Sequence, residues 1–128
     1  FLKSHKLSTG KLGVTGFCYG GGATDALAIA LGADLQAGVP YYGAAPATDG
    51  IPKIKAPLLV HLAENDQRIN DMYPAFEAAA KAAGVPYQIH VYPGTQHGFH
   101  NNSTPRYNEA AAKLSWERTV AHFKKHLA

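Results

Sequence analysis

The stretch Gly16-Phe17-Cys18-Tyr19-Gly20-Gly21-Gly22 decides the fold class. An apolar run over 11–17, typical of a buried strand, leads into it, and an Ala- and Leu-rich run over 23–31, typical of a helix, follows it. The pattern G-x-C-x-G is the sharp strand-to-helix turn G-x-S-x-G with cysteine in place of serine. Glycines flank such a turn because side chains there would collide with the strained backbone. We therefore expect an α/β protein with the Cys18 thiol at the end of a strand.

Strand patterns and helical patterns alternate along the rest of the chain. Further strands are expected over 35–41, 57–63 and 87–92, and further helices over 70–83 and 104–127. Thr104 and Pro105 predict the start of the last helix, as N-cap and first-turn proline. An apolar stripe is expected to pack this helix on the sheet, formed by Trp116, Val120, Phe123 and Leu127. This order predicts a parallel sheet of about four strands flanked by helices.

Two strands differ in their expected place within the sheet. The run 57–63 is almost continuously apolar, as in a parallel strand that is buried on both faces. The run 87–92 alternates apolar and polar residues, which suits a strand nearer the sheet edge.

Composition bounds the protein to one domain and excludes several classes of partner. The 128 residues are 46% hydrophobic and 16% charged, which suits a single globular domain over 1–128. The net charge of +3 comes from scattered basic residues, so we expect no nucleic-acid partner. One cysteine excludes a disulfide framework and fits a reducing compartment, and no apolar run is long enough to span a bilayer. These features predict a soluble cytoplasmic protein with no membrane partner.

Three reactive side chains follow three of the expected strands. In a parallel sheet the loops after the strands gather at one edge, where such folds bind ligands. Those loops hold Cys18, Asp66 and His97, in the chain order nucleophile, acid, base. A thiol, a carboxylate and an imidazole can together perform nucleophilic catalysis. The backbone N–H of Tyr19 is expected to hold an oxyanion, and the helix N-terminus to favour the Cys18 thiolate.

Four segments resemble the dienelactone hydrolase (carboxymethylenebutenolidase) family of the α/β-hydrolase fold: Gly16–Gly21, Tyr41–Gly43, Glu64–Asp66 and His97–Phe99. The resemblance runs from about Leu12 to the C-terminus. It implies the C-terminal half of that fold, since four strands and two helices normally precede the nucleophile strand.

The resemblance also implies a mechanism. Cys18 would be the nucleophile, His97 the general base and later acid, and Asp66 the group that orients the imidazole. The implied reaction is hydrolysis of a small-molecule activated ester or enol-lactone through an acyl-enzyme on sulfur, with no metal and no organic cofactor.

The substrate contacts are expected near the same loops. The candidates are Tyr41, Tyr42, Gly98, Phe99 and Asn101. The family places Ser directly after the catalytic His and Arg three residues further on, where they hold a substrate carboxylate. Gly98 and Asn101 stand at these positions, so we expect neutral esters or lactones to react at least as well as carboxylated ones.

Other interpretations stay open at this point. The chain could be an inactive truncated remnant of such a hydrolase, or a flavodoxin-like module that binds phosphate through its glycine-rich turn. The phosphate-binding interpretation is weak, because no Lys-Ser/Thr pair follows the glycine-rich turn and G-x-G-x-x-G is absent. Asp66 could instead cap a turn, and His122 and His126 share a helix face that we expect to be solvated. If the strand over 11–17 forms a sheet edge, the chain is expected to self-associate through it.

Overall fold

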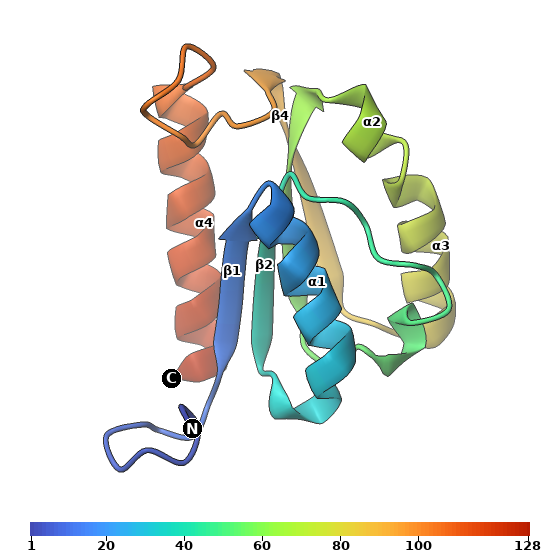
Figure 1. Ribbon diagram of the computed structural model, residues 1–128, viewed down its shortest axis with the longest axis vertical. Coiled ribbons are helices and arrows are strands. Elements are labelled where there is room, and N and C mark those ends of the chain that lie inside the picture. Colours follow the sequence, from blue (N-terminus) through green and yellow to red (C-terminus); the bar gives the residue numbers. More distant parts are fainter.

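A computed structural model describes residues 1–128. Its four strands are parallel and adjacent in chain order, namely β1 (Gly13–Phe17), β2 (Ala37–Tyr41), β3 (Leu58–Asn65) and β4 (Tyr87–Gln96). The helices are α1 (Tyr19–Leu31), α2 (Gln67–Asn70), α3 (Tyr73–Ala83) and α4 (Glu109–Leu127), with 3₁₀ turns at Gly32–Asp34 and Ile51–Lys53. All four strands point the same way, so their carboxyl ends meet at one edge (Figure 1). The expected parallel α/β sheet of four strands is confirmed.

The apolar residues of β3 divide between two cores. Leu58, Val60 and Leu62 belong to the core that includes residues of α1 and α3, whereas Leu59 and Ala63 belong to the core that includes α4. Figure 1 shows α4 on one face of the sheet and α1 and α3 on the other. Successive strand residues point to opposite faces, so a strand between two cores is apolar throughout. The strand β4 pairs with β3 alone and lies at the edge, as its alternating pattern predicted.

Three helices begin elsewhere than expected. The helix α1 starts directly after Cys18, so the three glycines that follow Tyr19 lie within its first turn. One helix was expected over 70–83, whereas the structure has two, α2 and α3, and Pro74 lies in the first turn of α3. The helix α4 begins at Glu109 rather than near Thr104.

The start of α4 is fixed by an asparagine. The side chain of Asn108 accepts a hydrogen bond from Ala111 N at 3.0 Å, which caps the helix. Thr104 does not cap it, because its hydroxyl donates to the carbonyl of Asn101 in a preceding turn.

The face that α4 turns to the sheet consists of small residues. Its buried members are Ala111, Ala112, Ser115 and Thr119. Trp116 is 47% exposed, so the expected stripe is wrong at this residue. Thr119 faces the sheet because its hydroxyl hydrogen-bonds to the buried Tyr41 Oη at 2.7 Å and to His61 Nε2 at 3.0 Å. None of the helices combines the length and apolar character needed to cross a bilayer.

Candidate active site

Cys18 forms a strained turn between β1 and α1. Its backbone has φ 57° and ψ −117°, a positive φ that is uncommon outside glycine. A Cβ atom at Gly16 would collide with the Gly20 carbonyl, and one at Gly21 would collide with the Tyr41 carbonyl. A Cβ atom at Gly20 would meet nothing, so the turn requires glycine at positions 16 and 21 but not at 20. The turn leaves the Cys18 side chain exposed at the carboxyl edge of the sheet.

The Cys18 thiol is not held as a thiolate at rest. Burial raises the pKa of Cys18, the positive charge of Arg106 lowers it, and the negative charge of Asp66 raises it, with a net upward shift. This corrects the expectation that the helix N-terminus would favour the thiolate. Tyr19 is the first residue of α1, and the N–H of a first helical residue has no acceptor within its helix. Attack by Cys18 therefore needs a base to remove the thiol proton, while an N–H donor stands next to it in the chain.

His97 and Asp66 form a hydrogen-bonded pair. The distance from His97 Nδ1 to Asp66 Oδ2 is 2.5 Å, although the residues are 31 positions apart. Asp66 precedes α2, yet its side chain makes no capping bond, so the carboxylate serves the imidazole instead of a turn. An acceptor at Nδ1 places the proton of the neutral ring there and leaves Nε2 as the free acceptor. The ring of His97 packs edge to face on Tyr42 at 5.0 Å between centroids.

A pocket of about 430 Å³ opens at Cys18. The expected residues Tyr42, Gly98 and Asn101 line it together with Cys18. Four further lining residues were not predicted as site residues: Phe17, His100, Asn102 and Arg106. His97 is linked to this pocket through its contact with Tyr42.

Two expected contact residues lie in the core instead. Tyr41 and Phe99 are both fully buried and belong to the core that includes α4. The Tyr41 hydroxyl is already bonded to Thr119, and Phe99 packs on Tyr42 with ring centroids 5.3 Å apart. Both residues therefore support the pocket wall from behind and do not line it.

Arg106 is the one permanently charged residue among the four that were not predicted. Arg106 lies against Gly98, where a Cβ atom would be in ordinary contact with the guanidinium at 3.7 Å. No carboxylate lies within ion-pair distance of Arg106. The available signal was an arginine, ten residues after Gln96, in the loop that carries His97. The structure has no group of three or more His, Cys, Asp or Glu side chains placed to hold a metal ion.

A family model and several relatives of known sequence match this chain. The family model described as "Dienelactone hydrolase family" matches residues 1–127. The chain is 36% identical to the protein usf of Aquifex pyrophilus, covering 99% of this chain and 57% of usf. It is also 36% identical to an Azospirillum brasilense protein assigned as a carboxymethylenebutenolidase, covering 80% of this chain and 45% of that one.

A solved structure supports the same relationship. A Klebsiella pneumoniae protein assigned as a dienelactone hydrolase superimposes with a TM-score of 0.82 at 31% identity, over 88% of this chain and 51% of that one. The chain thus spans about half the length of these relatives.

Proposed function

This chain belongs to the dienelactone hydrolase family of the α/β-hydrolase fold, and from that premise we propose that it carries the Cys18-His97-Asp66 catalytic triad of an ester or lactone hydrolase. The observation that carries the proposal is the strained elbow at Cys18 on the same sheet edge as the hydrogen-bonded His97–Asp66 pair. The family assignment favours this function over a flavodoxin-like phosphate-binding module.

The first step is attack by sulfur on the substrate carbonyl. Because burial raises the pKa of Cys18, the thiol must lose its proton as the bond forms, and His97 Nε2 is the free acceptor in the proposed triad. The bond from sulfur to the carbonyl carbon forms, and the oxyanion is held by the N–H of Tyr19. Asp66 keeps the ring in the correct tautomer and stabilises the imidazolium.

The second step breaks the ester bond of the substrate and then hydrolyses the thioester. The bond to the leaving oxygen breaks, and His97 returns its proton to that oxygen, which leaves a thioester on Cys18. A water molecule, activated by His97, then attacks the thioester and frees the acid and the thiol. A thiol nucleophile suits a stable leaving group, so the proposed substrate is an activated ester or an enol-lactone.

Substitution of the triad tests the proposal in an active protein that contains this sequence. With p-nitrophenyl acetate and an enol-lactone as substrates, Cys18→Ala and His97→Ala are each expected to lower kcat/KM by more than about 10³-fold. The double variant should be little worse than either, because members of one catalytic unit are not additive. Asp66→Asn should lower kcat/KM by a smaller factor. Asp71, an exposed acid at the other end of α2, provides the matched control, and Asp71→Asn should leave kcat/KM unchanged.

A covalent readout separates catalysis from binding. Mass spectrometry after rapid quenching should show one acyl group on the protein, absent in Cys18→Ala. Independent, multiplicative losses at Cys18 and His97 would show that the two residues do not form one unit. Full activity of Cys18→Ala would show that Cys18 is not the nucleophile. An acyl group found on another residue would identify that residue as the nucleophile instead.

A further inference from the structure

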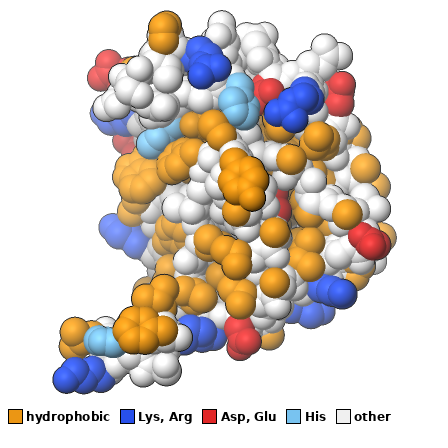
Figure 2. Space-filling view, in the orientation of Figure 1, with side chains coloured by type: hydrophobic (Ala, Val, Ile, Leu, Met, Phe, Trp, Pro, Cys, Tyr) orange, Lys and Arg blue, Asp and Glu red, His pale blue; other side chains and the backbone are white.

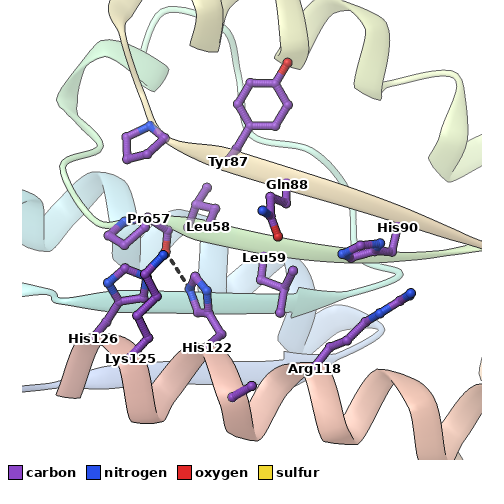
Figure 3. Close-up of a pocket in the computed structure, with 12 residues that line it drawn as sticks. Pro57, Leu58, Leu59, Tyr87, Gln88, His90, Arg118, His122, Lys125 and His126 are labelled. Carbon is purple, nitrogen blue, oxygen red and sulfur yellow. Dashed lines mark hydrogen bonds between the residues drawn. The ribbon is translucent and has the colours of Figure 1, made fainter. Parts of the chain in front are cut away.

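A second pocket lies between α4 and the first residues of β3 and β4. It has a volume of about 480 Å³ and shares no residue with the pocket at Cys18. Figure 3 shows the side chains of α4 rising towards the two strands, with His122 bonded to the Pro57 carbonyl. Leu59, which is almost completely buried, provides an apolar floor between the strands and the helix.

The ionisable side chains that line this pocket, apart from Tyr87, are all basic. Nitrogen-bearing side chains come from both β4 and α4: His90, Arg118, His122, Lys125 and His126. No aspartate or glutamate lines the pocket. The two ion pairs of the structure, Lys3–Asp34 and His97–Asp66, lie elsewhere, so Arg118 and Lys125 have no carboxylate partner. A concave surface with unpaired cations and no anion is complementary to an anionic ligand.

Buried groups hold the guanidinium of Arg118 in place. Its Nη1 donates to Tyr92 Oη at 3.1 Å, and the guanidinium lies 5.5 Å from the centroid of the same ring. Tyr92 Oη is bonded in turn to the fully buried His61 Nδ1 at 2.8 Å. A guanidinium held through a single hydrogen bond to one acceptor keeps its other N–H groups available, and their planar arrangement matches the oxygens of a phosphate or carboxylate.

His122 is fixed in a similar way. Its Nε2 lies 3.1 Å from Pro57 O, and a carbonyl can only accept, so the proton of the neutral ring is on Nε2. Nδ1 is then free to gain a proton and to donate to an anion. The sequence pattern predicted a solvated helix face here, but His122 is half-buried against the strand and not fully solvated.

We propose that this pocket binds a small phosphate monoester, with its phosphate against Arg118 and His90 and its organic group over Leu59, towards His122. The phosphate is placed at the Arg118 end because the last turn of α4, which carries Lys125 and His126, presents partly negative carbonyl oxygens. Lys125 contributes long-range attraction, and its flexible side chain reaches a bound anion from the other end. The site is independent of the triad.

Binding should take up protons. Burial and the neighbouring Arg118 lower the pKa of His90. Burial lowers the pKa of His122, its bond to Pro57 opposes this, and the nearby His126 and Lys125 lower it further. An anion reverses these repulsions and raises the pKa of both rings, so the bound state carries more protons and binding strengthens as the pH falls.

The other titratable groups that face His90 and His122 do not change the direction of this pH dependence. Burial and Lys125 lower the pKa of His126, so His126 behaves as its neighbours do. His61, stacked on His90 from β3, stays neutral because burial lowers its pKa to about 3.

Calorimetric titration of the protein with phenyl phosphate tests the site. We expect saturable binding at neutral pH that Arg118→Gln weakens by at least about tenfold, the loss expected for charged hydrogen bonds. Lys113→Gln removes the same charge from an exposed position of α4 outside the pocket and is the matched control, expected to leave binding unchanged. Phenol should not bind, and a dicarboxylate such as succinate should bind more weakly than the phosphate.

Sulfate tests the proton uptake because its own charge does not change near neutrality. It should bind at least about threefold more tightly at about pH 6 than at about pH 8. If Arg118→Gln fails to fold, Lys125→Gln replaces an exposed side chain and should still weaken phenyl phosphate measurably. No saturation at millimolar phenyl phosphate, equal losses in Lys125→Gln and Lys113→Gln, or tighter binding of succinate would each overturn the proposal.

Discussion

Asp25, in the middle of α1, is a carboxyl group enclosed by the core behind the Cys18 turn. It is 1% exposed, and neither carboxyl oxygen has a hydrogen-bond partner. Burial raises its pKa to about 8, so the group is mostly protonated at neutral pH. The nearby Tyr73, whose hydroxyl donates to Gly43 O at 3.2 Å, is affected in turn, because the Asp25 charge adds to burial in raising the pKa of Tyr73. A glutamate or aspartate in an apolar helix pattern gives no sequence signal for such burial.

The Asp25 carboxyl predicts a pH-dependent stability. The pKa of Asp25 is about 8 in the folded protein and about 3.9 in the unfolded chain. The contribution of Asp25 to the free energy of unfolding is therefore fully present below about pH 4 and is lost as the pH rises to about 8. Between these limits the slope attributable to Asp25 is about 1.4 kcal/mol per pH unit. Urea denaturation at several pH values should show this slope in the wild type and lose it in Asp25→Asn. The exposed Asp49→Asn is the control, and an unchanged slope in Asp25→Asn would contradict the assigned protonation.

At the scale of elements, the loop from His97 to Asn108 supplies most of the residues that line the pocket at Cys18. It carries Gly98, Asn101 and Arg106 on the pocket wall. Thr104 and Pro105 imitate a helix start, and a helix from there would have put Arg106 in its first turn. The structure instead ties Asn108 N to Phe99 O at 2.9 Å, a contact across the loop that local sequence patterns cannot reveal.

This loop explains which parts were predictable. Cys18 and its turn follow from a local steric requirement, and β3 follows from a continuous apolar run, so both could be read from short segments. The start of α4 is set by the Asn108 cap together with the bond from Asn108 N to Phe99 O across the loop, and the small-residue face around Thr119 depends on His61, far away in the chain. Pairing between Asp66 and His97 was expected from the resemblance. No sequence motif includes Arg106, so its place in the pocket could not be predicted.

Arg106 adds a cation to the pocket that the expectation about neutral substrates did not include. Its side chain lines the pocket at Cys18, although Gly98 and Asn101 replace the family's serine and arginine. In an active protein with this sequence, Arg106→Gln should lower kcat/KM for a carboxylated dienelactone by at least about tenfold. A neutral ester should change by less than about threefold, and Arg68→Gln, on α2, should affect neither. Equal losses for both substrates would assign Arg106 to folding of the loop instead.

At the scale of the whole molecule, β1 is an open edge of the sheet. It pairs with β2 on one side and with no strand on the other. Figure 2 shows hydrophobic side chains gathered along this side, between α4 and α1. Tyr19 is 92% exposed, and Trp116 and Leu27 are nearly half exposed. Unpaired backbone groups beside exposed apolar side chains form a template for association.

We therefore expect the 128-residue chain to self-associate through β1. Its sedimentation coefficient should rise with concentration in the micromolar range. Thr15→Lys places a charge on the exposed middle of β1 and should shift the protein towards monomer, since lysine on an edge strand opposes pairing. The substitution also removes the bond from Thr15 Oγ1 to Val39 O, so circular dichroism must show that the fold is retained. Thr9→Lys, the same change in the exposed segment before β1, is the control and should leave association unaltered. If the wild type is a monomer at every concentration, the open edge is too short or too twisted to pair.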